Sequence, residues 1–134
     1  EHHYASFPRS YYIEIERLRF ENVEVAINLE SNIEDIKVPP LLFISLIENA
    51  FKHGGLNNKK LKIKINCKIV KDTLHFEILN NFVLSQNIKT KKGIGLINTK
   101  KRLKLIFQND FRLDQKIKFN YYIICLKIPT QNEN

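Results

Sequence analysis

The alternation of apolar and polar residues between positions 60 and 81 constrains the fold more than any other feature of the sequence. In KLKIKINCKIV, residues 60–70, every second residue is apolar and most of those between are lysines. A period of two predicts a strand with one face in a core and the other in water. TLHFEILNN, residues 73–81, repeats the pattern after the polar pair Lys71-Asp72, so the two runs predict a β-hairpin. The inward-facing set is Leu61, Ile63, Ile65, Cys67, Ile69, Leu74, Phe76 and Ile78.

VPPLLFISLIENAFKHGG, residues 38–55, predicts a helix of about four turns. Its prolines suit the first helical position, and Gly54 and Gly55 suit a left-handed stop. At about 100° per residue, one face is apolar and the other forms a polar stripe. From the pattern alone, a solvated face is the commoner explanation of such a stripe. The apolar set is Phe43, Leu46, Ile47, Ala50 and Phe51, and the stripe is Ser45, Glu48, Asn49, Lys52 and His53.

The other segments complete a simple order of elements: helix, strand, helix, two strands, loop, helix, two strands. That order predicts an α+β fold, a two-layer α/β sandwich with a mixed, mostly antiparallel sheet and helices on one face. We expect the two closing strands to be joined by a turn near Gln115. The remaining predicted segments are a helix within 7–20, a strand over 23–29, a basic loop over 82–92, a helix after Gly93-Ile94-Gly95, and strands within 111–114 and 117–129.

Composition limits the class of protein. A chain of 134 residues with 43% hydrophobic content fits one domain. The net charge of +8 favours anionic partners, but the lysines are spread along the chain, so a nucleotide or a phosphorylated partner fits as well as nucleic acid. Cys67 and Cys125 lie in strand patterns without metal-ligand spacing, which predicts buried free thiols in a reducing compartment. No apolar run approaches the roughly 20 residues that span a bilayer, which predicts a soluble piece.

Three polar features suggest a binding site when they are taken together. They are the stripe around Asn49, the pair Asn80-Asn81 at the end of a buried strand, and Gly93-Ile94-Gly95 before a helix. Glycines before a helix let exposed amides approach a phosphate, which the helix dipole also favours. Taken singly, each has a simpler explanation as a solvated face, a strand-end cap or a tight turn.

In their order along the chain, these features resemble the ATP-binding fold shared by gyrase, Hsp90, histidine kinases and mismatch-repair ATPases. VPPLLFISLIENAFKHG and KKGIGLINTKKRLKLIF look more closely like the catalytic domain of LytS-type sensor histidine kinases. The pattern of that family is approximately PPLxLxPLVENAxKHG followed by GxGLxNxxxRL. The resemblance covers nearly the whole chain and implies a Bergerat-type fold that binds ATP and Mg²⁺.

The resemblance also implies roles for individual residues. Asn49 would hold Mg²⁺, and Glu48 would polarise the attacking imidazole or metal-bound water. Related proteins often place their base four positions before the asparagine, which is Ser45 here, so Glu48 could instead be structural. The loop 82–92 would be a lid whose lysines contact ATP. The implied nucleotide-binding set is Ser45, Asn49, Lys52, His53, Asn80, Lys92, Gly93, Ile94, Gly95 and Leu96.

The chain departs from the family at two points. The adenine site usually has Asp-x-Gly or Asp-Asn-Gly, whereas Asn80-Asn81-Phe82 stands here. The PHF segment that carries the phosphoacceptor histidine is not in the sequence. We therefore expect residues 1–20 to be a linker helix and 21–134 to be a catalytic domain, inactive alone, from a longer homodimeric kinase anchored in a bacterial inner membrane. Its partners would be ATP, its own dimerisation segment and a response regulator. We expect the catalytic domain to lie in the cytoplasm.

Two other functions stay open from the sequence. The altered adenine site is compatible with a domain that has lost its nucleotide and acts as a dimerisation or docking module. Nucleic-acid binding through the basic surface is a third and weaker hypothesis.

Overall fold

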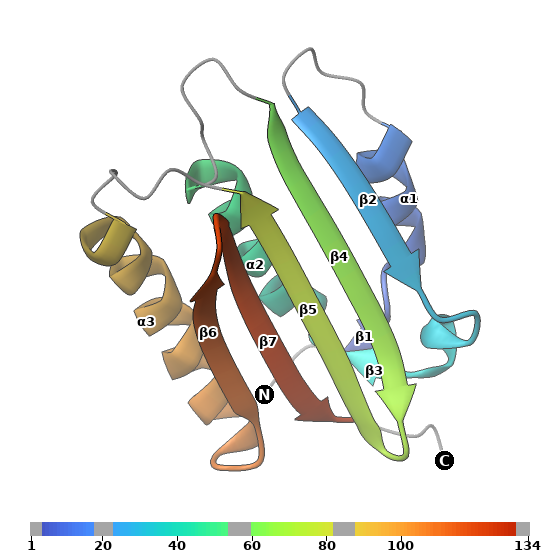
Figure 1. Ribbon diagram of the computed structural model, residues 1–134. Coiled ribbons are helices and arrows are strands. Elements are labelled where there is room, and N and C mark those ends of the chain that lie inside the picture. The colour runs from blue at the N-terminus through green and yellow to red at the C-terminus, as the bar shows by residue number, and fades with distance from the viewer. Residues whose placement is uncertain (1–3, 18–22, 54–59, 82–87, 131–134) are drawn as a thin grey trace.

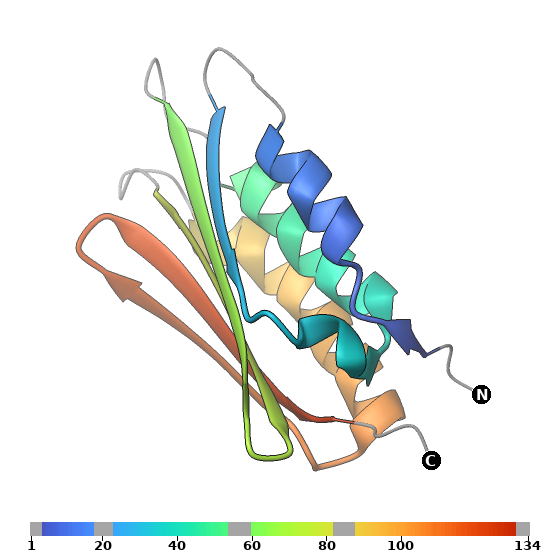
Figure 2. The same cartoon turned by 90° about the vertical axis from the view of Figure 1, so that its right-hand side faces the viewer.

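A five-stranded sheet with helices on one face forms the body of the molecule (Figures 1 and 2). The computed structural model describes residues 4–17, 23–53, 60–81 and 88–130. Its strand order is β2-β4-β5-β7-β6, parallel between β2 and β4 and antiparallel elsewhere, which confirms the predicted fold class. The strands are β2 Val23–Leu29, β4 Leu61–Val70, β5 Thr73–Asn81, β6 Arg112–Lys118 and β7 Tyr121–Pro129; the helices are α1 Arg9–Arg17, α2 Pro40–His53 and α3 Ile88–Phe107.

A second, two-stranded sheet precedes α2 and was not predicted from the sequence. β1, Ala5–Ser6, pairs antiparallel with β3, Lys37–Val38, and the short 3₁₀ helix Ile33–Asp35 leads into β3. Two residues per strand are too few to produce a visible period, so the sequence carries no sign of them.

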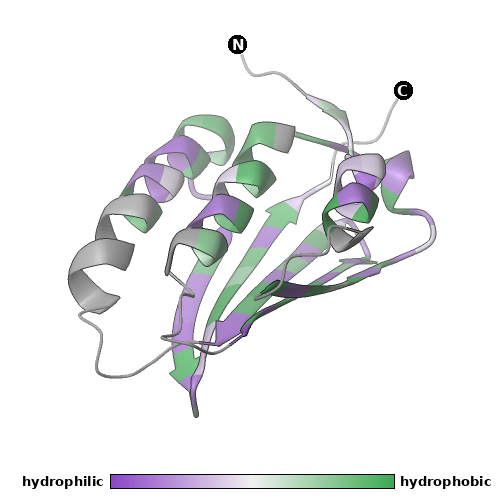
Figure 3. Ribbon diagram, turned by 90° about the horizontal axis from the view of Figure 1, so that it is seen from above, coloured by the Kyte–Doolittle hydropathy of each residue, from purple (hydrophilic) through white to green (hydrophobic). Residues whose placement is uncertain are grey.

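The hairpin of β4 and β5 is confirmed residue by residue. Ile65 lies opposite Ile78, and the turn is at Lys71, whose φ is 57°. Of the predicted inward set, all are buried except Ile69, which is half-buried. Figure 3 shows the alternation as bands of hydrophobic and hydrophilic colour along the strands. Cys67 and Cys125 are both free, with Cys67 buried and Cys125 half-buried.

Four aromatic rings join the helical layer to the sheet. Phe43 of α2 lies edge-on to Phe76 of β5 at 4.9 Å between ring centroids. Phe7, just before α1, packs edge-on to Phe43 at 5.4 Å and stacks on Tyr12 at 5.1 Å. Such pairs contribute about 0.5–1.5 kcal/mol beyond the burial of their area. Because Phe7 and Tyr12 belong to the predicted linker segment, that segment packs into the core of the domain.

Two predicted boundaries are wrong. The closing strands turn at Phe119 and Asn120, not near Gln115. Phe119 takes a φ of 58°, a left-handed conformation for which glycine or asparagine is the expected residue, so the pattern did not mark it. Gln115 lies inside β6, where its side chain accepts a hydrogen bond from the Tyr122 hydroxyl at 2.6 Å. The basic loop predicted over 82–92 is shorter, because α3 begins at Ile88 and residues 82–87 lie outside the described ranges.

Tyr12 provides a test of the core. Its hydroxyl is buried and has no hydrogen-bond partner among the described residues. Burial also raises the pKa of Tyr12, so the group stays protonated. Because an unpartnered buried hydroxyl is destabilising, we expect Tyr12→Phe to raise the free energy of unfolding by about 1 kcal/mol in urea denaturation. Tyr11→Phe is the control, since Tyr11 is only half-buried, and should change little. A loss of stability in Tyr12→Phe would contradict this account of the core.

Candidate functional site

The three polar features predicted from the sequence come to one end of the molecule. The carboxyl end of α2, the carboxyl end of β5 and the start of α3 all lie at the top of Figure 1. α2 and α3 pack against each other on the same face of the sheet, and α2 also contacts β5. The fold therefore brings together segments that lie up to about forty positions apart in the sequence, as expected when a strand end meets helix ends at one edge of a layer.

Asn49 is the polar residue of the α2 stripe that the fold buries. Its residue exposure is 8%, whereas the neighbouring Glu48 is exposed and Ser45 is intermediate. The Asn49 amide nitrogen, Nδ2, is buried and has no hydrogen-bond partner among the described residues. Leaving such a group unpaired costs about 1–3 kcal/mol, so an additional partner at this position would stabilise the site. The simple explanation of the stripe as a solvated face does not hold for Asn49.

Asn80 is buried on the helix side of the sheet, on the same face as Ile78 and Phe76. It is 2% exposed and lies in register with Ile63 on one side and Tyr122 on the other. Its Nδ2 donates to the Asn81 carbonyl oxygen at 3.0 Å. Only the nitrogen end of the amide can face a carbonyl, so this bond sets the orientation of the group. The side-chain oxygen of Asn80, Oδ1, is therefore the end of the amide that can accept a hydrogen bond from a ligand.

Asn81 has a different task. Its side-chain oxygen accepts from the Lys62 amide at 2.9 Å, and its nitrogen donates to the Lys60 carbonyl at 2.9 Å. These two bonds extend the pairing of β4 and β5 past the last backbone pair. Asn81 is thus a structural residue that holds the end of β5 beside β4, while Asn80 stays available to a ligand.

Ser45 and Arg102 join α2 to α3. The Ser45 hydroxyl donates to the Leu41 carbonyl at 3.1 Å and accepts from Arg102 Nη1 at 3.2 Å. Sequence reasoning did not select Arg102, although it lies within the quoted α3 motif. Because serine has no ionised state near neutral pH and this hydroxyl is already engaged, Ser45 is poorly suited to act as a base here.

Glu48 is exposed on α2, and its carboxylate is close enough to α1 to act on Tyr11. Burial, followed by the charge of the Glu48 carboxylate, raises the pKa of Tyr11 in α1. Tyr122, which neighbours Asn80, was also not selected from the sequence. Burial raises the pKa of Tyr122 to about 12, so its hydroxyl remains a donor.

The glycine motif does not form the predicted turn in this structure. α3 begins at Ile88, which places Gly93, Ile94 and Gly95 inside the helix, where backbone amides are paired with carbonyls one turn earlier. The Leu96 side chain is buried in the core. Lys52 and His53 close α2, but their side chains, like those of Lys92 to Gly95, lie outside the described part of the chain.

No helix within the described ranges combines the length and apolar character needed to cross a bilayer. The same ranges contain no group of three or more histidine, cysteine or acidic side chains placed to hold a metal ion.

Comparison with known sequences finds sensor histidine kinases. The chain is 26% identical over 125 residues to the sensor histidine kinase BtsS of Escherichia coli, covering 91% of this chain and 22% of that protein. It is 35% identical over 63 residues to the sensor histidine kinase/phosphatase LytS of Staphylococcus aureus, covering 46% of this chain and 11% of that protein. The chain thus spans about a fifth or less of these relatives. No protein-family model matches it.

Solved structures with the same fold include histidine kinases and their catalytic domains. The ThkA catalytic domain superposes with a TM-score of 0.69 at 18% identity, covering 99% of both chains. Full-length ShkA in complex with AMPPNP gives 0.68 at 13% identity, covering 99% of this chain and 32% of that one. ThkA in complex with the response regulator TrrA gives 0.62 at 19% identity, covering 92% and 39%. Sequence and fold agree, and the predicted resemblance is confirmed: the chain has the histidine kinase catalytic-domain fold and is similar in sequence to the LytS-type sensor histidine kinases.

Proposed function

We propose that this chain binds Mg-ATP between α2, the end of β5 and α3, and that it supplies the γ-phosphoryl group to a histidine on a helical dimerisation segment not contained in the chain. The observation that carries the proposal is the buried Asn49 amide nitrogen, which has no hydrogen-bond partner in the described part of the chain. It belongs to α2, whose carboxyl end lies near that of β5 (Figure 1). Similarity to BtsS and LytS and the ATP analogue bound to ShkA support the proposal.

The residues at this end fit a magnesium nucleotide. Mg²⁺ prefers oxygen ligands and is partly held by the substrate's phosphates and by water, so one protein side chain is a sufficient anchor. Asn49 would provide that oxygen, and its nitrogen would donate to a phosphate oxygen. When bound, Mg²⁺ would neutralise the negative charge that develops on the phosphates during transfer.

Asn80 would recognise the base. The hydrogen bond from Asn80 Nδ2 to the Asn81 backbone oxygen orients the Asn80 side chain. The side-chain oxygen of Asn80 can then accept a hydrogen bond from the exocyclic amine of adenine, but it would repel the carbonyl oxygen of guanine. We therefore propose that asparagine keeps the adenine selectivity that aspartate provides in the wider superfamily.

The roles proposed for the other residues follow from their positions. The exposed Glu48 would polarise the acceptor imidazole. Ser45 would position α2 against α3 through Arg102. For the amides of Gly93 to Leu96 to reach phosphates, the first turns of α3 must open. Each glycine weakens a helix by about 1 kcal/mol relative to alanine, which lowers the cost of that opening. Lys52, His53 and Lys92 would contact phosphates or ribose.

The whole kinase would be a homodimer anchored in a bacterial inner membrane, with a response regulator as the next acceptor, as in the complex of ThkA with TrrA. Residues 1–20 would link its dimerisation segment to the catalytic domain over 21–134, with Phe7 and Tyr12 of the linker packed in the core of that domain.

Asn49→Ala tests the metal-nucleotide site. Because the Asn49 amide nitrogen has no partner within the ranges that the structure describes, the substitution should cost the free protein little stability. It should, however, remove most of the melting-temperature increase produced by millimolar Mg-ATP, while the smaller increase with adenosine persists. Asn28→Ala, the same change at an exposed asparagine of β2, is the control and should keep the full response. A wild-type protein whose melting temperature ignores Mg-ATP would instead support a domain that has lost its nucleotide.

Asn80 variants test base recognition. Asn80→Ala should weaken ATP binding by about 1–3 kcal/mol, because a buried hydrogen bond to the base is lost. Wild type should bind ATP more tightly than GTP in calorimetry. Asn80→Asp should destabilise the free domain, because a carboxylate oxygen would then face the Asn81 carbonyl. Unchanged ATP affinity in Asn80→Ala would show that the base binds elsewhere.

Phosphotransfer tests the reaction. With labelled ATP, the chain alone should incorporate negligible acid-labile phosphate, because it lacks the acceptor segment. Adding the dimerisation segment of a LytS-type kinase should give slow labelling of that segment, and Glu48→Gln should reduce the rate more than it reduces ATP affinity. Acid-labile label on the isolated chain would contradict the proposal.

A further inference from the structure

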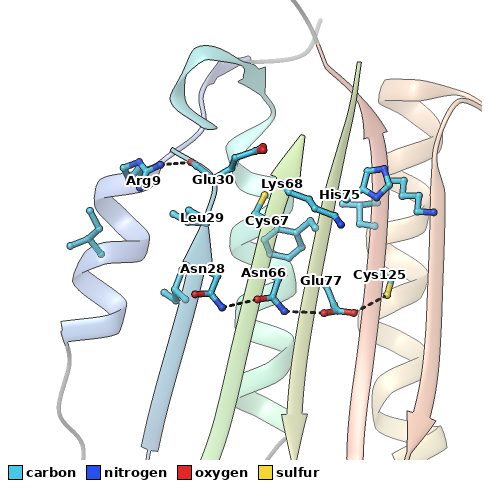
Figure 4. A pocket seen from close by; sticks show the side chains of 15 residues that line it. Arg9, Asn28, Leu29, Glu30, Asn66, Cys67, Lys68, His75, Glu77 and Cys125 are labelled. Atoms are coloured by element: carbon cyan, nitrogen blue, oxygen red, sulfur yellow. Dashed lines mark hydrogen bonds between the residues drawn. The ribbon is translucent and has the colours of Figure 1, made fainter. Parts of the chain in front are cut away.

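The face of the sheet opposite the helices carries a hollow of about 900 Å³ (Figure 4). Neither Asn49 nor Asn80 lines it. No described helix covers this face (Figure 2). The hollow is lined by residues of β2, β4, β5 and β7, with Arg9 and Ile13 of α1 at its margin (Figure 4). The proposed nucleotide site does not account for it.

A hydrogen-bonded row of polar side chains crosses the floor of the hollow. Asn28 donates to Asn66 at 3.0 Å, and Asn66 donates to one oxygen of Glu77 at 3.0 Å. The Cys125 thiol contacts the other oxygen of Glu77 at 3.8 Å. Figure 4 shows these bonds as a line across four strands. Both oxygens of the Glu77 carboxylate are therefore engaged within the row.

A basic row lies next to the polar row. Lys68, His75, Lys127 and Arg112 are in register across β4, β5, β7 and β6. Burial, followed by the charges of Lys127 and Lys68, lowers the pKa of His75, as expected when two cations approach one imidazole. Among the described residues, no ion pair involves Lys68 or Lys127, whereas Arg112 pairs with Asp114 at 2.8 Å.

The other carboxylate of the hollow, Glu30, forms no ion pair with these lysines among the described residues. Glu30 accepts a hydrogen bond from the Ile69 amide at 2.6 Å, at the end of the β2–β4 ladder. Arg9, at the rim, pairs with Glu34 at 2.9 Å. Two lysines in register on either side of a histidine thus share a hollow with two carboxylates that hydrogen-bond to neutral donors and form no ion pair with these lysines among the described residues.

We propose that Lys68, His75 and Lys127 form a docking site for an acidic segment of a protein partner, which lies in the hollow with its carboxylates against the lysines. Neighbouring strands are about 4.8 Å apart, so the two lysine backbones are roughly 10 Å apart, which is about the diameter of a helix. Charge complementarity favours carboxylates, and the asparagine amides of the polar row can accept and donate hydrogen bonds at the edge of the contact.

A protein segment fits this face better than other polyanions. A hollow matches the curved surface of a helix or strand and not the plane of a bilayer. The hollow exposes no aromatic side chains on which unpaired bases could stack, since the Phe76 side chain is buried on the core side. The site is also separate from the nucleotide site, because His75 and Asn80 lie on opposite faces of β5 and five positions apart, which is roughly 17 Å along a strand.

The test compares two double charge reversals with the same change in net charge. Lys68→Glu/Lys127→Glu alters the proposed site; Lys62→Glu/Lys118→Glu alters exposed lysines at the other end of the same face. Binding of a short fluorescein-labelled oligoglutamate is followed by anisotropy in low-salt buffer. We expect measurable binding by wild type, a loss of about tenfold or more in the first variant and a loss within about threefold in the second. If the charge reversal Lys68→Glu/Lys127→Glu impairs folding, Lys68→Gln/Lys127→Gln replaces it and should also lose binding of oligoglutamate.

The other outcomes overturn the proposal. Equal losses in both charge reversals would mean attraction by overall charge alone. Binding of phosphatidylserine vesicles or random single-stranded DNA through Lys68 and Lys127, without binding of oligoglutamate, would assign the site to another polyanion. If wild type does not bind oligoglutamate, the basic row is not a docking site and its charges serve only solubility. Failure of Mg-ATP binding bears only on the proposed function, because the inference does not depend on it.

Discussion

The contact of Phe43 with Phe76 is the interaction on which the arrangement of the domain depends. It joins the first turn of α2 to the middle of β5, and Phe7 and Tyr12 add the amino-terminal segment to the same cluster. With these rings packed, the position of α2 along the strand is set, because ring pairs tolerate little sliding at van der Waals distance. The carboxyl end of α2 must then lie beside the carboxyl end of β5. The aromatic cluster thus places Asn49 and Asn80 at the same end of the molecule, although neither asparagine is a member of the cluster.

The fold was largely predictable because its central elements have strong periods. The hairpin over 61–81 alternates without interruption, and α2 combines a start signal with a continuous apolar face, so both were identified with nearly correct ends. The errors lie where the residue type does not match the conformation. Phe119 turns the chain with a positive φ, whereas the glycines at 93 and 95, which usually mark a turn, lie in a helix.

The candidate site was predictable only in part, for a different reason. A sequence shows which asparagines lie near a motif. It does not show which asparagine side chains are already hydrogen-bonded to backbone groups. Asn80 and Asn81 are adjacent and chemically identical, yet one is used to extend the β4–β5 ladder and the other presents its oxygen to the helix side. Likewise, the Ser45 hydroxyl accepts a hydrogen bond from Arg102, fifty-seven positions away, which no local sequence pattern predicts. The basic row on the open face was missed because its members come from four strands and align only once the register is known.

The edge strand β6 has a consequence for how the domain behaves at high concentration. β6 pairs with β7 on one side only, and within the described chain no strand covers its other side. An exposed edge offers unpaired amides and carbonyls to any other strand, which is a common route to aggregation. Within seven residues, however, β6 carries Arg112, Lys116 and Lys118, with Asp114 as its one acid. Two copies that met edge to edge would bring these cations together. Charge on this edge strand therefore disfavours sheet extension between molecules and lets the domain keep an open strand in solution.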